Sequence, residues 1–393
     1  MNILVITSIL PLPSAINEND FILHLYGNYR NIYREDSIVI IVPVKYDLNI
    51  LTILKGKTRL KKLKGKLSWH INNFQIEIYP FFAAWSLRNI HAFVSRSVFY
   101  LNRKRINNLF KTNAFDIIHA RFIFADGMLA YLISRKYKVP YIVSTHKEMF
   151  YFDHFYSKNI AFKIWRNASF VLPVSYINVQ YFKLNNVNNV FQVTHGFDNN
   201  FIKVQRKQEN EKVQILTVSR LLAYKNIDQV VRALSKLKMH DNFSYTLIGK
   251  GPEKKYLQNL VNSFGLDNVV SFIDEVPHEL IGEEMYKYDI FILPSYFETF
   301  GRVYFEAMAM GIPVICAKKS GIYGVFKEKE EGLAVDHRDV DDISNALAFL
   351  IENREERLRI GRNGQKLVKT FTWENIAEVL HQKYLESISA HSE

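Results

Sequence analysis

Short apolar runs alternate with segments of helical period along nearly all of the 393 residues. This alternation is typical of βα units, in which crossover helices join parallel strands. Seven runs in the first half predict buried strands at residues 3–7, 37–43, 75–79, 116–120, 141–145, 170–174 and 190–193. Six more predict strands at residues 214–219, 245–249, 269–273, 290–294, 313–316 and 332–335. The sequence therefore predicts an α/β fold with two sheets.

A polar stretch without periodicity, residues 203–212 (KVQRKQENEK), separates the two series and is typical of a linker. At about 150 residues per domain, the chain is long enough for two domains. We predict two Rossmann-like, doubly wound domains that face a central cleft, at residues 1–203 and 204–372. Residues 373–393 are predicted to form a helix that crosses back to the first domain. In such sheets ligands bind beyond the carboxyl ends of the strands, so polar residues at strand ends are the first functional candidates.

The net charge of +12 is concentrated in one window. Residues 48–115 contain thirteen basic residues and one acidic residue, so this window alone carries the excess. Its cations are interleaved with the aromatic residues Trp69, Phe81, Phe82, Trp85, Phe93, Phe99 and Tyr100. This mixture suits an anionic membrane surface, and it equally suits a solvated basic face with the aromatic rings in the core. Nucleic acid is not expected as a partner, because the sequence contains no RNA or DNA recognition motif.

The single cysteine, Cys316, excludes an intrachain disulfide and multi-cysteine metal sites, and it favours a reducing compartment. Residues 2–7 are apolar but lack the basic region and cleavage site of a signal peptide, so we interpret them as a buried strand. No uncharged apolar run approaches the roughly 18 to 20 residues that a membrane span needs. We expect a cytoplasmic protein, soluble or peripheral on the inner face of the membrane.

The motif richest in functional signals is residues 294–315 (PSYFETFGRVYFEAMAMGIPVI). A predicted strand ends at Pro294, and a helix is predicted to follow Gly301. The backbone amides at the start of that helix would be unpaired donors, suited to a diphosphate. Glu298 and Glu306 supply carboxylates, each able to accept two hydrogen bonds from a ribose diol. Taken singly, Glu298 could instead be a capping acid and Glu306 a solvated helix residue.

Two further strand ends carry candidate binding residues. Arg220 closes the first predicted strand of the second half, and Lys225 follows before a helix. These two cations could clamp a diphosphate and stabilise it as a leaving group. Gly249 and Gly251 follow the next strand, where glycine lets the backbone approach a phosphate or nucleoside. Residues 249–252 (GKGP) match neither the G-x-G-x-x-G fingerprint of dinucleotide-binding proteins nor the P-loop motif. This mismatch disfavours nicotinamide dehydrogenases and P-loop NTPases.

Histidine and acidic residues elsewhere give weaker signals. His146 lies at a strand end and is therefore a candidate, whereas His119 lies within a strand and a lone histidine is more often structural. Asp339 and Asp341 resemble a metal pair, but helix capping explains them equally well. No histidine or cysteine cluster supports a metal, and the G-x-S-x-G hydrolase motif is absent. We therefore predict no metal site.

The stretch from Glu298 to Glu306 resembles the E-x7-E motif of retaining nucleotide-sugar glycosyltransferases with the GT-B fold, specifically glycosyltransferase family 4. The similarity extends over nearly the whole chain. It includes residues 218–220, 225–226, 248–252, 331–333 and 371–373 and, more loosely, 116–119, 140–146 and 195–198.

The resemblance implies a role for each candidate. Glu306 would hold the ribose hydroxyls, and Arg220 and Lys225 the diphosphate. Glu298 and the amides of Thr299, Phe300 and Gly301 would contact the donor sugar, with His146 near the anomeric carbon. The resemblance further implies that no metal or other cofactor is needed, and that the donor is a nucleotide-diphosphate sugar, UDP- or GDP-linked. The family's glycine pair after the first strand is missing from residues 8–20, where Asn17, Glu18 and Asn19 are the candidates for those contacts.

The function implied is retaining transfer of a sugar to a hydroxyl of a glycan or lipid-linked acceptor, in bacterial cell-surface polysaccharide or lipopolysaccharide synthesis. The basic window would then bring the enzyme to a membrane-bound acceptor. Two alternatives stay open: a GT-B nucleotide-sugar epimerase, and a non-enzymatic protein that binds anions.

Overall fold

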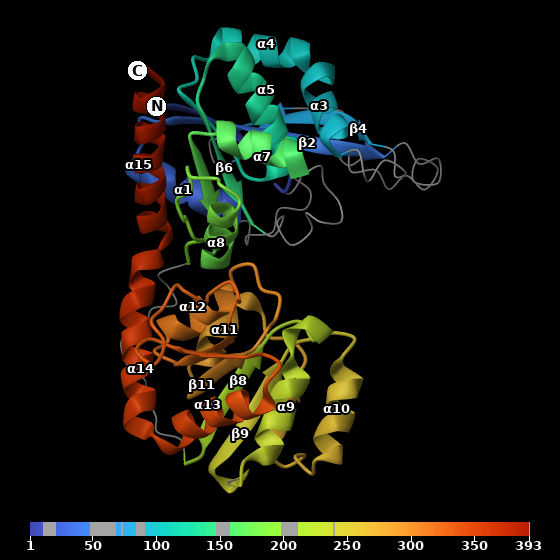
Figure 1. Ribbon diagram of the computed structural model, residues 1–393, viewed down its shortest axis with the longest axis vertical. Helices are drawn as coiled ribbons and strands as arrows, with labels where there is room; N and C mark the ends of the chain where they lie inside the picture. The colour runs from blue at the N-terminus through green and yellow to red at the C-terminus, as the bar shows by residue number, and fades with distance from the viewer. Residues whose placement is uncertain are drawn as a thin grey trace. The chain divides into compact units, whose positions relative to one another are not determined.

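The computed structural model describes residues 1–10, 21–47, 68–71, 74–83, 91–146, 158–197, 211–238 and 240–392. The chain folds into two compact units (Figure 1). The first consists of Met1–Val174, Asn178–Thr194 and Trp373–Glu393, and the second of Ser175–Ile177 and His195–Thr372. Each unit is a sheet covered by helices, which confirms the predicted α/β class with two doubly wound folds.

The first unit contains a seven-stranded sheet in the order β3-β4-β2-β1-β5-β6-β7. The strands are β1 Asn2–Ile6, β2 Ser37–Asp47, β3 Ser68–Ile71, β4 Phe74–Ala83, β5 Ile117–Ala120, β6 Tyr141–Thr145 and β7 Phe170–Pro173. All neighbours are parallel except β3 and β4, which are antiparallel. Six of the seven predicted strands are confirmed. The seventh, 190–193, is wrong, because Val190 forms only a single bridge to Val171.

The helices of this unit are α1 Phe21–Ile32, α3 His91–Leu101, α4 Arg103–Thr112, α5 Met128–Tyr137, α7 Lys158–Asn167, α8 Tyr176–Leu184 and α15 Trp373–Ser392. On one face of the sheet, Leu4 and Ile6 of β1 belong to a buried core with side chains of α3, α5 and α7. Ile3 and Val5 are equally buried and point to the opposite face, because side chains alternate along a strand. Burial on both faces explains the continuous apolar runs of the sequence. Helices α1 and α15 pack against each other (Figure 1).

The second unit contains a six-stranded parallel sheet in the order β10-β9-β8-β11-β12-β13. The strands are β8 Val213–Val218, β9 Phe243–Ile248, β10 Val270–Ile273, β11 Ile290–Leu293, β12 Val314–Ala317 and β13 Leu333–Val335. All six predicted strands of this half are confirmed. The helices are α9 Ile227–Lys236, α10 Lys254–Ser263, α11 His278–Met285, α12 Arg302–Ala309, α13 Val340–Glu352 and α14 Arg354–Val368. In Figure 1, α9 and α10 pack side by side in this unit.

Each sheet has a point where the strand order reverses. In the first unit the reversal lies between β1 and β5, and in the second it lies between β8 and β11. In open α/β sheets, ligands bind at such a point, beyond the carboxyl ends of the two strands. Residues that follow β1, β5, β8 and β11 are therefore the best placed to meet a ligand.

Much of the basic window lies outside the described residues. Within the described part, Phe81 and Phe99 are buried in the core, as expected if the aromatic rings have a structural role. Tyr100 and Arg96 are exposed. The candidates Asn17, Glu18 and Asn19 also lie outside the described residues. Among the helices that the structure describes, none is both long and apolar enough to cross a membrane.

Candidate functional site

An ion pair between Lys225 and Glu298 lies at the reversal point of the second sheet. Strands β8 and β11 are paired in parallel, with Ile290 opposite Ile215, so their carboxyl ends meet at one edge. Lys225 follows β8, Glu298 follows β11, and Lys225 Nζ lies 2.5 Å from Glu298 Oε2. Both side chains are largely buried, at 12% and 18% exposure. Two residues that the sequence predicted separately are thus brought together.

A backbone hydrogen bond joins the loop after β8, which contains Lys225, to the loop after β11, which contains Glu298. Lys225 ends a short 3-10 turn, and Asn226 takes a left-handed conformation with φ 56° before α9 begins. The amide of Tyr296 donates to the carbonyl of Tyr224 at 3.2 Å. Lys225 Nζ also lies 5.3 Å from the centroid of the Tyr224 ring, within the range of a cation–π interaction. These contacts hold the Lys225 ammonium in place beside the loop that follows β11.

The amino end of α12 provides backbone donors next to the pair. The helix begins at Arg302, and Gly301 before it has φ +79°. A Cβ at Gly301 would lie 2.5 Å from the Tyr304 ring, so both space and conformation require glycine. In the described part of the chain, the amides of Thr299, Phe300 and Gly301 donate no hydrogen bond. The Phe300 ring is buried against Phe305.

The structure decides between the interpretations of the two glutamates. The N-cap residue of α12 is Gly301 and no side chain caps the helix, so the capping interpretation of Glu298 is wrong. Glu306 is only 6% exposed, so it is not a solvated helix residue either. Arg302 Nη2 lies 3.8 Å from Glu306 Oε1. A carboxylate buried inside a helix is costly, which favours a role for Glu306 beyond surface solvation.

Arg220 and the two glycines belong to the same edge of the sheet. Arg220 is the second residue after β8, and its side chain is exposed. A Cβ at Gly249 would lie 1.8 Å from the Ser219 carbonyl oxygen, and one at Gly251 would lie 2.1 Å from the Leu221 carbonyl oxygen. Both glycines therefore allow the loop after β9 to pack on residues 219–221. This close packing of two backbones accounts for the glycines structurally and fixes the chain on either side of Arg220.

The two histidines considered in the sequence analysis differ in their surroundings. His119 is fully buried, with the Tyr26 and Tyr384 hydroxyl oxygens each 2.8 Å from Nδ1 and Ser144 Oγ 2.8 Å from Nε2. Burial, with a smaller contribution from the nearby Arg121 charge, holds the pKa of His119 well below its usual value, so the ring is neutral. This confirms a structural histidine. His146 directly follows β6, with its ring against Phe21 and Phe122.

The acidic pair near residue 340 caps a helix. Asp339 is the N-cap residue of α13, and its Oδ1 accepts from the amides of Asp341 and Asp342 at 2.9 Å and 3.2 Å. This confirms the capping interpretation. Across the described ranges, no group of three or more histidine, cysteine or acidic residues could hold a metal ion.

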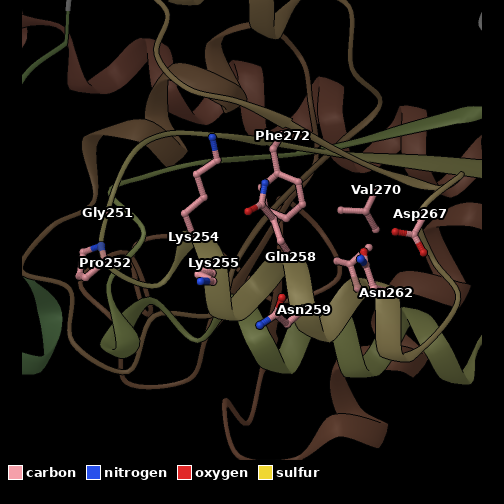
Figure 2. A pocket seen from close by; sticks show the side chains of 11 residues that line it. Gly251, Pro252, Lys254, Lys255, Gln258, Asn259, Asn262, Asp267, Val270 and Phe272 are labelled. Atoms are coloured by element: carbon pink, nitrogen blue, oxygen red, sulfur yellow. The ribbon is translucent and has the colours of Figure 1, made fainter.

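A pocket of about 790 Å³ lies between α10 and the edge strand β10. Figure 2 shows the polar side chains along α10, among them Lys254, Gln258 and Asn262, that line it together with Phe272. Gly251 borders this pocket, but Arg220, Lys225, Glu298 and Glu306 do not line it. The pocket is therefore separate from the edge where the predicted residues gather.

Residues 198–367 match the family model described as glycosyl transferases group 1. An uncharacterized glycosyltransferase of Methanocaldococcus jannaschii is 23% identical over 341 residues, which are 82% of this chain and 95% of that protein. The D-inositol 3-phosphate glycosyltransferase of Corynebacterium efficiens is 32% identical over 180 residues, 44% of this chain and 42% of that protein. In structure, HepE of Anabaena, solved in complex with UDP, has the same fold, with a TM-score of 0.70 at 19% identity over 97% of this chain and 99% of that chain.

These matches support a glycosyltransferase with the GT-B fold. The family match falls on the part of the chain that contains the Lys225–Glu298 pair and α12. An epimerase or a non-enzymatic anion-binding protein is not favoured by these matches.

Two features near the candidate site were not anticipated from sequence. Tyr224 supports Lys225 through its ring, and nothing in its local pattern marks it. Arg121 directly follows β5 at the reversal point of the first sheet, and it is only 4% exposed. Its place at a strand end is the same signal that singled out His146, and it could have been applied to Arg121 as well.

Proposed function

We propose that the chain is a retaining, metal-independent glycosyltransferase of family 4. It transfers a sugar from a nucleotide-diphosphate sugar, UDP- or GDP-linked, to a hydroxyl of a glycan or lipid-linked acceptor. The Lys225–Glu298 pair beside the unpaired amides of 299–301 carries this proposal, because it joins a cation, a carboxylate and oriented backbone donors at one strand edge. That HepE was solved with UDP supports a nucleotide-diphosphate site in this fold.

Lys225 and Arg220 bind the diphosphate together with the amino end of α12. Without donor, the charge of Lys225 is balanced by Glu298 at 2.5 Å. When a diphosphate arrives, its oxygens compete for the ammonium, and Glu298 is released to accept hydrogen bonds from the hydroxyls of the donor sugar. Negative charge grows on the leaving phosphate as its bond to the anomeric carbon breaks. The two cations and the amides stabilise that charge, so no metal is needed for this task.

Glu306 binds the ribose. Its carboxylate has two oxygens, and a buried carboxylate with few competing water molecules forms strong hydrogen bonds to a vicinal diol. Gly249 and Gly251 border the nucleotide site. Their close packing on residues 219–221 also holds the backbone on either side of Arg220 in place.

The transfer itself occurs on one face of the sugar. The acceptor hydroxyl oxygen forms the new bond to the anomeric carbon on the side from which the diphosphate leaves, and its proton passes to the departing phosphate oxygen. The configuration of the anomeric carbon is then retained without a covalent intermediate on the protein. His146 serves near the anomeric carbon by orienting the acceptor.

We place the reaction in bacterial cell-surface polysaccharide or lipopolysaccharide synthesis, in the cytoplasm, with the basic window of residues 48–115 on an anionic membrane surface. Sedimentation with lipid vesicles at low salt tests the membrane contact. More protein should sediment with anionic than with neutral vesicles, and the difference should disappear at high salt. Equal sedimentation with both vesicle types would contradict it.

A thermal-shift screen of nucleotide diphosphates and their sugars tests the donor site. A ligand at a hundred times its dissociation constant stabilises the folded state by about 2.7 kcal/mol. For a folding unit of 150 to 250 residues this corresponds to a rise in melting temperature of roughly 5 to 10 °C. We expect UDP or GDP and the matching sugar nucleotide to produce this rise without added Mg²⁺. If no nucleotide diphosphate shifts the melting temperature, the proposed function is wrong, and donor turnover with no acceptor present would favour the epimerase.

A further inference from the structure

Arg121 occupies the reversal point of the first sheet. It directly follows β5, and its amide donates to the Ile6 carbonyl of β1 at 2.9 Å, so it lies where β1 and β5 end together. The residue is 4% exposed. A ligand at the carboxyl edge of this sheet would therefore meet a guanidinium that is already desolvated.

Among the described residues, the Arg121 guanidinium has the hydroxyl groups of Ser144 and Tyr26 as partners but no carboxylate. One guanidinium nitrogen, Nη1, donates to Ser144 Oγ at 3.2 Å. The Nε atom is buried without a hydrogen-bond partner, and none of the ion pairs in the described part of the chain includes Arg121. A buried guanidinium without a carboxylate costs free energy, and arginine cannot shed its proton to avoid that cost. Such a group is suited to an anion that arrives with the substrate.

Two hydroxyl groups lie at the neighbouring strand ends. Thr7 follows β1 and Thr145 ends β6, the strands on either side of β5. Both residues are fully buried, and neither Oγ1 atom has a hydrogen-bond partner. At the ends of three adjacent strands there is therefore a buried side chain with one polar atom that has no hydrogen-bond partner, which is unusual for buried polar groups.

Arg121 is also close to His146. Both side chains lie near the Phe21 ring, whose centroid is 5.5 Å from Arg121 Cζ and 5.6 Å from the centroid of the His146 ring. A group bound at Arg121 would thus lie near the same aromatic ring as the histidine that we place near the anomeric carbon.

We propose that Arg121 binds an oxyanion, a phosphate or a carboxylate, that the acceptor carries, and that it thereby positions the acceptor hydroxyl. The planar guanidinium can form two parallel hydrogen bonds to either anion. The role of this anion as part of the acceptor rests on the proposed function, whereas the anion site itself does not.

Titration calorimetry of the full chain with inorganic phosphate, and in parallel with acetate, tests the site. A Lys225→Met background removes the proposed phosphate site of the second unit. In that background we expect saturable binding of one or both anions. Adding Arg121→Met should weaken it at least about tenfold, since a hydrogen bond to a charged group contributes about 1.5 to 3 kcal/mol. Adding Arg34→Met, a matched change at an exposed arginine between α1 and β2 and outside the basic window, should leave the affinity unchanged.

The melting temperature separates an anion site from a structural role. Replacing an unpaired buried charge by an apolar side chain of similar volume should leave the melting temperature unchanged or raise it, whereas a structural arginine would lower it when removed. Should Arg121→Met not fold, Arg121→Lys keeps the charge but loses the two parallel bonds, and it should weaken binding by a smaller factor. Undiminished anion binding by Arg121→Met, or no saturable binding by the parent, would overturn the proposal. Nucleotide-induced shifts should be unaffected by Arg121→Met, so failure of the donor assignment would be seen separately.

Discussion

Substitution of Lys225 by methionine should reduce sugar transfer by about 10²- to 10³-fold, the loss typical of removing one group that stabilises transition-state charge. Lys225 is held beside Glu298 by the loop after β8, so the ammonium is already oriented when the diphosphate binds. The measurement is kcat/KM for the donor with a saturating acceptor.

A matched control is available in the same unit. Lys236 Nζ lies 2.5 Å from Asp341 Oδ1, the same separation as in the Lys225–Glu298 pair, but these side chains are 49% and 71% exposed. Lys236→Met should leave the catalytic rate unchanged and alter stability by less than about 1 kcal/mol, because exposed ion pairs contribute little. Near-normal transfer by a folded Lys225→Met variant would refute the placement of the diphosphate.

Substitution of Glu306 by glutamine should lower kcat/KM for the donor by about 10²-fold. Each hydrogen bond from a ribose hydroxyl to a charged acceptor contributes about 1.5 to 3 kcal/mol, and 1.4 kcal/mol corresponds to a factor of ten. Glutamine keeps the size of the buried side chain but supplies one neutral acceptor in place of two charged oxygens. The loss should appear mainly in the donor KM, because the ribose is distant from the bonds that change.

The control for this variant is Glu355→Gln at the exposed first turn of α14. It removes the same charge from the same unit and should leave donor KM unchanged. A binding role for Glu306 would be untenable if both variants bound the donor as the wild type does.

Much of the fold could be predicted from the sequence because its parallel strands are buried on both faces. β6, for example, has the same bounds in the sequence prediction and in the structure. β3 escaped prediction because Ser68–Ile71 is short and mixes polar with apolar residues. Among the strands that the structure describes, it pairs with the antiparallel β4 alone. The predicted strand at residues 190–193 has the right apolar character, but only Val190 bridges to β7. An apolar run indicates that a segment is buried. Whether the segment pairs as a strand depends on other strands, which are distant in the sequence and do not appear in the local pattern.

The candidate site could be predicted one residue at a time but not as an arrangement. Lys225 and Glu298 are 73 residues apart, and each was recognisable from its place after a strand. Their contact depends on β8 and β11 being neighbours, which no local pattern encodes. Arg121 shows the same limit in the first unit, because a lone arginine is usually exposed, whereas this one is buried in contact with Ser144 of β6 and Phe21 of α1.

The central claim is that a nucleotide diphosphate binds where Lys225 and the amino end of α12 meet. Calorimetric titration of the full chain with the nucleotide diphosphate that gives the largest thermal shift tests it most directly. We predict one site in the wild type and in Lys236→Met, with an affinity at least about tenfold weaker in Lys225→Met, as the loss of one charge-assisted bond requires. Equal affinity in all three proteins would contradict the claim.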